Sequence, residues 1–197
     1  MDTYKTISTI SEGLYKEKGS RFISYAIPVD KLEEIKEILK DYRKRYYDAR
    51  HVCYAYMLGA EREEFRANDD GEPSGTAGRP ILGQINSFEL TNVLIIVVRY
   101  FGGILLGTGG LVTAYKEASA NALQQADIIE KTVDCSLSVE FEYPLMNDVM
   151  RIVKEIDAQI TKQHFEYNCL LDISIRKRDY PIFVDKLTKI DGIKILD

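Results

Sequence analysis

Residues 93–110 read VLIIVVRYFGGILLGTGG, and this stretch decides how the first part of the chain folds. The run from Val93 to Val98 is apolar throughout, which is typical of a central strand that is covered on both faces. A helical pattern follows from Leu111 to Gln125. Between them, glycines crowd the connection at Gly102, Gly103, Gly107, Gly109 and Gly110. A strand, a glycine-rich loop and a helix start in this order can aim several backbone N–H groups at an anion, so the stretch predicts a binding surface.

A second glycine-rich stretch lies shortly before it, where residues 69–80 read DDGEPSGTAGRP. Its oxygen-bearing side chains are Asp69, Asp70, Glu72, Ser74 and Thr76. Such hard donors suit Mg²⁺ or Ca²⁺, although their spacing is not that of an EF-hand. Asp-Gly and Pro-Ser-Gly are also ordinary turn sequences. We favour a rigid recognition loop over a metal site, with Arg79 either pairing with the carboxylates or contacting an anion.

Two side chains at the end of the predicted strand are candidate ligand contacts. Arg99 can hold a phosphate bidentately, and Tyr100 or Phe101 can stack on a base. The alternative is that the two aromatic residues fill the core while Gly102 and Gly103 allow a tight turn. The glycine loop matches neither a Walker A motif nor the dinucleotide fingerprint. If Arg99 is a ligand contact, replacing it with alanine weakens binding and leaves the melting temperature nearly unchanged.

His51 stands at the start of another predicted strand, residues 52–58. An acid–base role for it needs a partner that the sequence does not show, so we group it with the recognition loop. Cys53 lies two residues further on and faces the same side, which allows a Cys/His pair. The chain has three widely spaced cysteines and two histidines, without zinc-site spacing, so buried free thiols are expected.

The pattern along the chain predicts two domains, residues 1–131 and 132–197. The first domain is predicted to contain strands within 4–27 and two further strands, over 52–58 and 91–100, together with helices and one long loop. We expect Asp30 and Glu33 to form a capping box on its first helix. The other predicted elements of this domain are a helix over 31–46, a loop over 60–80, a short helix over 80–86 and the strand and helix described above.

The second domain is predicted to have the order βαββαβ, which is that of the ferredoxin-like motif. Its expected elements are strands over 133–142, 159–166, 168–176 and 193–196, and helices over 145–157 and 180–190.

Composition excludes several classes of protein. The chain is 45% apolar and 29% charged over 197 residues, so it can bury ordinary cores. Its apolar runs are far shorter than the roughly 20 residues that span a bilayer, and its N-terminus has no signal core, so we expect a cytoplasmic protein. The net charge is −5 and no basic tail stands out, which counts against strong non-specific binding to nucleic acid.

Taken together, these motifs resemble the IMPACT/YigZ family. The resemblance covers essentially residues 4–197 and is most specific in residues 69–80; residues 142–148 (EYPLMND) look like that family's small C-terminal domain. Its other motifs are Arg21-Phe22-Ile23, His51-x-Cys53-Tyr54-Ala55-Tyr56 and Arg99-Tyr100-Phe101-Gly102-Gly103. The resemblance implies an α+β chain: a ribosomal protein S5 domain 2-like domain, then a ferredoxin-like domain similar to the last domains of elongation factor G.

The resemblance also bears on function. Eukaryotic members regulate translation by interfering with activation of a stress-responsive initiation-factor kinase, and they use an RWD domain that this sequence lacks. We therefore do not expect that pathway here. Two positions depart from the family pattern: Leu105 stands where a lysine is usual, and Val52 where an asparagine is usual. The missing lysine weakens the case for phosphate binding in the glycine loop and leaves Arg79, Arg99 and backbone N–H groups to hold any anion.

These observations favour a non-enzymatic translation-associated protein that needs no cofactor. Its expected partners are RNA, the ribosome or a translation factor, bound in a groove lined by Arg79, Arg99, Tyr100 and the glycine-rich stretches. The alternative is an enzyme acting on a small phosphorylated or nucleotide substrate with Mg²⁺ at the acidic loop, because small-molecule kinases share the S5-like fold. A third interpretation is an adaptor whose ferredoxin-like domain binds a protein.

Overall fold

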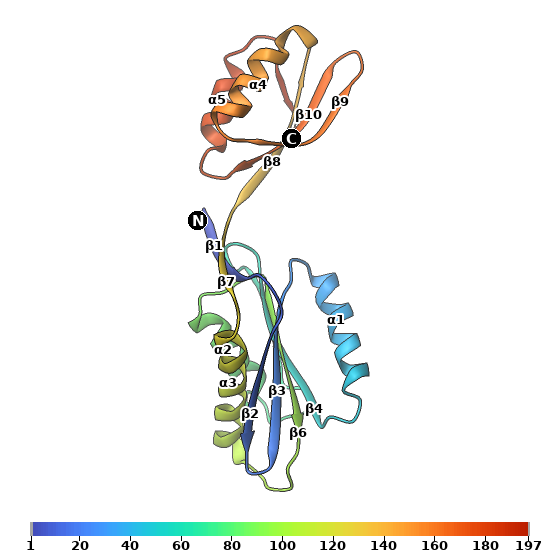
Figure 1. The fold of residues 1–197 in the computed structure, drawn as a ribbon, viewed down its shortest axis with the longest axis vertical. Helices are drawn as coiled ribbons and strands as arrows, with labels where there is room; N and C mark the ends of the chain where they lie inside the picture. The colour runs from blue at the N-terminus through green and yellow to red at the C-terminus, as the bar shows by residue number, and fades with distance from the viewer. Residues whose placement is uncertain (1, 197) are drawn as a thin grey trace. The chain divides into compact units, whose positions relative to one another are not determined.

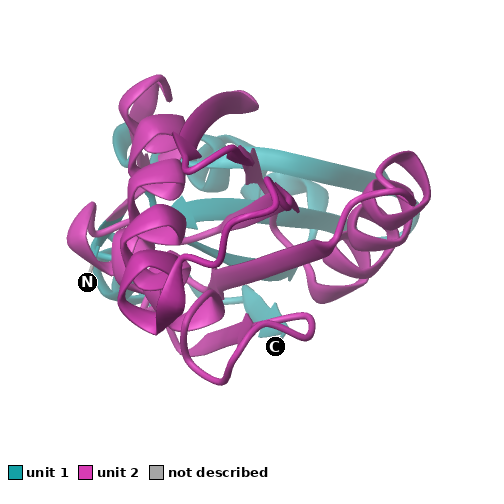
Figure 2. Ribbon diagram, turned by 90° about the horizontal axis from the view of Figure 1, so that it is seen from below, with its two compact units in different colours: residues 1–3, 132–197 teal, residues 4–131 magenta. Residues whose placement is uncertain are grey.

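The computed structural model describes residues 2–196 and is drawn in Figure 1. The chain divides into two compact units, residues 4–131 and residues 1–3 with 132–197 (Figure 2). Each unit has its own buried hydrophobic residues. None of the helices within residues 2–196 is long and apolar enough to cross a bilayer.

A five-stranded antiparallel sheet forms the centre of the first unit, in the order β2-β3-β6-β4-β5. β6 lies in the middle, and its residues Val93 to Arg99 are all buried, as its apolar sequence predicted. The strands are β2 (Ser11–Glu17), β3 (Ser20–Pro28), β4 (His51–Leu58), β5 (Glu64–Asn68) and β6 (Val93–Tyr100).

Helices cover both faces of this sheet (Figure 1). One face packs against α1 through a cluster that includes Ile35 and Leu39, and the other packs against α2 and α3 through a cluster that includes Ile81 and Tyr115. A separate two-stranded sheet joins the start of the unit to its end. These elements are α1 (Leu32–Arg45), α2 (Gly78–Ser87), α3 (Gly107–Gln124), β1 (Thr3–Ile7) and β7 (Ile128–Thr132).

Three local predictions were wrong in this unit. The predicted loop over 60–80 contains β5, a mostly exposed edge strand whose polar sequence lacks an apolar run. The predicted capping box is absent, because Lys31 is the N-cap of α1 and the Asp30 backbone N–H donates instead to Glu34 Oε2 at 3.1 Å. Helix α3 begins at Gly107 rather than Leu111, so three of the predicted loop glycines belong to its first turn.

The second unit is a four-stranded antiparallel sheet in the order β11-β8-β10-β9, with two helices packed on it. A βαββαβ chain with this strand order is the ferredoxin-like arrangement. Its elements are β8 (Asp134–Phe141), a 3-10 turn (Tyr143–Leu145), α4 (Met146–Glu155), β9 (Gln159–Phe165), β10 (Cys169–Arg176), α5 (Tyr180–Thr188) and β11 (Lys194–Leu196). The chain thus has the predicted α+β fold, an S5 domain 2-like domain followed by a ferredoxin-like domain.

Candidate functional site

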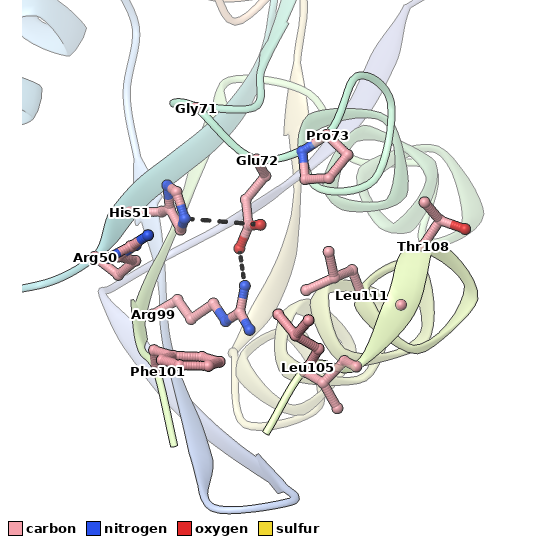
Figure 3. A pocket seen from close by; sticks show the side chains of 12 residues that line it. Arg50, His51, Gly71, Glu72, Pro73, Arg99, Phe101, Leu105, Thr108 and Leu111 are labelled. Carbon is pink, nitrogen blue, oxygen red and sulfur yellow. Dashed lines mark hydrogen bonds and ion pairs between the residues drawn. The ribbon is translucent and has the colours of Figure 1, made fainter. Parts of the chain in front are cut away.

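A pocket of about 430 Å³ lies in the first unit, where β4 begins and β6 ends. Its walls come from residues 50–51, from residues 71–73 of the loop after β5, and from segments between residues 99 and 111 (Figure 3). The two glycine-rich stretches therefore line the same pocket. The full set of lining residues is Arg50, His51, Gly71, Glu72, Pro73, Arg99, Phe101, Leu105, Leu106, Gly107, Thr108 and Leu111.

A buried carboxylate, Glu72, is the centre of the polar contacts in this pocket. Glu72 Oε1 accepts a hydrogen bond from Arg99 Nη1 at 2.6 Å and another from the Tyr115 hydroxyl at 2.8 Å. The side chains of Glu72 and Arg99 are only 3% and 6% exposed. Opposite charges buried together offset the cost of removing each from water, so the pair is a structural part of the pocket.

The Cys53 thiol lies behind this pair and does not contact the pocket histidine. Its sulfur is 3.3 Å from the Tyr115 hydroxyl oxygen and 3.0 Å from the Asp69 carbonyl oxygen. Burial raises the pKa of the Cys53 thiol and the pKa of Tyr115 well above their usual ranges. Both groups therefore stay protonated at neutral pH, and the Cys/His pair that the sequence allowed is not formed.

His51 is held by the acidic loop. Its Nδ1 is 2.7 Å from the Asp70 carbonyl oxygen, and because a carbonyl only accepts, Nδ1 carries the proton. Its Nε2 lies 3.7 Å from Glu72 Oε2, on the pocket side (Figure 3). The loop thus contributes two neighbours of this histidine, the Asp70 carbonyl, which accepts its proton, and the Glu72 carboxylate, which lies beyond hydrogen-bond distance.

The predicted recognition loop is rigid because its own side chains hold its backbone. Asp69 accepts hydrogen bonds from the backbone N–H groups of Gly75, Ala77 and Gly78 at 2.8, 3.0 and 2.8 Å. Partial burial acts to raise the pKa of Asp69, but these three donors outweigh it and lower that pKa overall. The Thr76 hydroxyl donates to the Pro73 carbonyl at 2.6 Å.

The three loop carboxylates are therefore engaged by the protein itself. Asp70 accepts a hydrogen bond from the Val52 backbone N–H at 2.7 Å, and Asp69 accepts hydrogen bonds from backbone N–H groups of the loop. Glu72 pairs with Arg99. Within residues 2–196 no group of three or more His, Cys, Asp or Glu side chains is arranged to hold a metal ion. These contacts hold the acidic loop in place, and Ser74 is exposed outside the pocket lining.

Of the eight residues predicted to contact an anion, only Arg99 and Gly107 line this pocket. Arg79 is exposed on α2, and Tyr100 lies on the opposite face of β6 from Arg99, with its hydroxyl 2.9 Å from Asp48 Oδ1. Successive strand residues alternate between faces, which separates Tyr100 from Arg99. Phe101, one residue beyond the strand, takes the aromatic position in the pocket instead.

The glycines of the second stretch have different structural roles. A Cβ on Gly102 would lie 1.9 Å from the carbonyl carbon of Gly19, so the backbone that approaches it closely belongs to the turn between β2 and β3. Gly103 and Gly107 have φ angles of +88° and +71°, which favour glycine. A Cβ on Gly109 would meet nothing within 4 Å, and a Cβ on Gly110 would meet only the Leu106 side chain.

Comparison with known proteins places this pocket within a family domain. Residues 18–123, which include every lining residue, match the Impact N-terminal domain. This chain belongs to the IMPACT family. It is 35% identical over 172 residues to "IMPACT family member YigZ" of Escherichia coli (strain K12), a match that covers 86% of this chain and 84% of that protein.

Two further similarities extend over nearly all of this IMPACT family protein. It is 28% identical over 194 residues to "IMPACT family member YvyE" of Bacillus subtilis (strain 168), covering 98% of this chain and 89% of that protein. The crystal structure of a hypothetical protein superposes with a TM-score of 0.77 at 31% identity and covers 100% of this chain and 97% of that one. Both units therefore occur together in that solved structure.

Proposed function

We propose that this IMPACT family protein is a cytoplasmic, non-enzymatic translation-associated protein that binds single-stranded RNA, free or on the ribosome, through its first unit. The observation that carries the proposal is the pocket together with a basic and aromatic rim beside it. A Mg²⁺-dependent enzyme is not favoured, because hydrogen bonds and ion pairs already engage Asp69, Asp70 and Glu72.

The rim is formed by the end of α1 and the connection to β4. The last turn of α1 carries Arg43, Lys44 and Arg45, and Arg43 Nη2 reaches Asp70 Oδ1 at 3.4 Å, so this helix end lies beside the recognition loop. Arg50 lines the pocket itself. Cations of this kind neutralise phosphates without reading the base sequence.

Exposed aromatic rings accompany these cations. The residue Tyr47 is 85% exposed and Phe101 is 45% exposed. Proteins that bind single strands combine a positive groove with aromatic rings on which bases stack, and each stacked base contributes about 1–3 kcal/mol. Tyr47 and Phe101 are therefore the stacking residues of the proposal.

The second unit does not offer a comparable RNA surface. In sheets of this kind that bind RNA, aromatic side chains on the central strands stack the bases. The central strands here are β8 and β10, and their side chains on the face away from the helices are Asp134, Ser136, Ser138, Glu140, Leu170, Asp172, Ser174 and Arg176. None is aromatic, three are carboxylates that repel phosphate, and the one cation, Arg176, pairs with Asp2. RNA binding is therefore assigned to the first unit.

Binding of a short, labelled single-stranded RNA, measured by fluorescence anisotropy at rising salt, tests this function. We expect saturable binding at low ionic strength. The logarithm of the association constant is expected to fall linearly with the logarithm of the salt concentration, with a slope of about −0.7 for each phosphate that the protein neutralises. Tyr47→Ala weakens binding several-fold, whereas Tyr167→Ala, which changes a fully exposed tyrosine in the second unit, does not. Absence of binding to RNA and to sedimented ribosomes at low ionic strength overturns the proposal.

A further inference from the structure

A buried arginine in the pocket has a donor without an acceptor. Arg99 uses Nη1 for Glu72, but its Nε–H has no hydrogen-bond partner among residues 2–196 although the atom is buried. The guanidinium points into the pocket between Glu72 and Phe101 (Figure 3). Because the Nε atom has almost no accessible surface, a ligand in the pocket meets Arg99 at Nη2, which has no hydrogen-bond partner among residues 2–196.

The first turn of α3 faces the same space. Gly107 and Thr108 line the pocket, no side chain caps the helix at Leu106, and the first turn contains no acidic residue. The N–H groups of a first helical turn have no partners within the helix and carry the positive end of the helix dipole. The Arg99 donor and this helix start thus line the same pocket.

The charge around the pocket favours a doubly charged anion. Arg50 and Arg99 contribute two positive charges and Glu72 one negative charge, and the start of α3 adds roughly half a positive charge. The sum over these groups is about +1.5. A phosphate monoester carries about −1.5 to −2 at pH 7, whereas an internal phosphodiester of RNA carries only one negative charge.

The shape and lining of the pocket favour the end of a ligand rather than a passing chain. Its inner side is closed by the buried side chains of Glu72 and Arg99, so a strand cannot run through it. Apolar side chains of Phe101, Leu105 and Leu111 line much of the rest. A bare inorganic anion leaves these side chains uncovered, whereas the sugar and base of a nucleotide cover them.

We propose that the pocket binds a nucleotide through a terminal phosphate monoester, with the phosphate at Arg50, Arg99 and the start of α3. The nucleotide is the phosphorylated end of an RNA or a free nucleoside monophosphate, which present the same chemistry. For the phosphorylated end of an RNA, the inference rests on the proposed RNA-binding function. It extends that function by naming the part of the RNA that enters the pocket.

The test compares one short RNA sequence in three forms, with a 5′-phosphate, with a 3′-phosphate and with hydroxyl groups at both ends, alongside a nucleoside monophosphate as competitor. We expect one phosphorylated form to bind about tenfold more tightly than the hydroxyl form, as charge-assisted hydrogen bonds predict. Arg50→Gln removes this preference and keeps the melting temperature. Arg151→Gln, the same change at an exposed arginine of the second unit, keeps the preference.

The outcomes separate the two proposals. Equal binding of all three RNA forms overturns the terminal-phosphate inference and leaves RNA binding intact. Binding of the nucleoside monophosphate with no binding of any RNA supports the pocket chemistry and overturns the RNA function. If neither the nucleotide nor any RNA binds, both are overturned.

Discussion

Arg99, at the end of β6, and Glu72, in the loop after β5, form a buried ion pair with 2.6 Å between Nη1 and Oε1. The pair ties the recognition loop to the central strand of the sheet, and both residues form the inner side of the pocket. The geometry contradicts the picture of Arg99 as a freely replaceable ligand contact, because removing it leaves the Glu72 carboxylate buried without its cation.

Arg99→Met is therefore expected to destabilise the protein by about 3–5 kcal/mol, the usual loss when one partner of a buried pair is removed. Urea unfolding followed by circular dichroism measures this change. The double variant Glu72→Gln/Arg99→Met is expected to be more stable than Arg99→Met alone, because no charge is then left unpaired. A double variant that is less stable than Arg99→Met contradicts the structural role of the pair.

Two glycines of the same stretch predict opposite effects of one substitution. Gly102→Ala places a Cβ against the backbone of Gly19 and Ser20, so we expect a loss of stability of about 1–3 kcal/mol. Gly109→Ala meets no neighbour and lies in a helix, where alanine is favoured over glycine by up to about 1 kcal/mol. Thermal unfolding of the two variants side by side checks the prediction, and similar shifts in both contradict it.

Much of the fold follows from local pattern. The apolar run of β6 identifies a central strand, and the alternation of strands and helices after residue 132 identifies the ferredoxin-like unit. β5 escaped prediction because an exposed edge strand needs no apolar alternation. The start of α3 at Gly107 was not predicted because glycine has a low helix propensity, so the first turn of this helix does not look helical in the sequence.

The site was less predictable, because its contacts join distant parts of the chain. Glu72 meets His51, Arg99 and Tyr115 only after the sheet and α3 have brought three segments together. Sequence alone also placed Arg99 and Tyr100 in one groove. Successive side chains along a strand point to opposite faces of the sheet, so Tyr100 cannot share a face with Arg99. This alternation could have predicted that Phe101, rather than Tyr100, lies beside Arg99 in the pocket.

Asp69 gives a pH-dependent prediction. Its pKa is lower in the folded chain than the ordinary value of 3.8, because the backbone donors of the loop outweigh the opposing effect of burial. A lowered folded-state pKa means that this carboxylate contributes its full stabilisation above the unfolded-state pKa and loses it as the pH falls through the folded value. Stability is therefore expected to fall on acidification below about pH 4.

Asp69→Asn is expected to remove this contribution, so that the free energy of unfolding falls less steeply as the pH is lowered below about 4. At neutral pH the variant loses about 1.5–3 kcal/mol, the range for hydrogen bonds to a charged acceptor. Urea unfolding from neutral pH down to acid measures both effects. Asp185→Asn serves as the control, since its carboxylate is exposed and pairs with the exposed Lys189 one helical turn away. An unchanged fall in stability on acidification in Asp69→Asn contradicts the role of Asp69 in holding the loop backbone.

The three thiols are expected to differ in reactivity because only the thiolate form is a nucleophile. Cys53 is buried, and burial raises its pKa, so alkylation by iodoacetamide in the folded protein is expected to be very slow. Cys135 is partly exposed and is expected to react first. Peptide mass spectrometry after brief labelling gives the order, and labelling in urea, where all three cysteines are accessible, provides the control. Fast labelling of Cys53 in the folded state contradicts its burial against the Asp69 carbonyl and the Tyr115 hydroxyl, because a reagent must displace these neighbours to reach the sulfur.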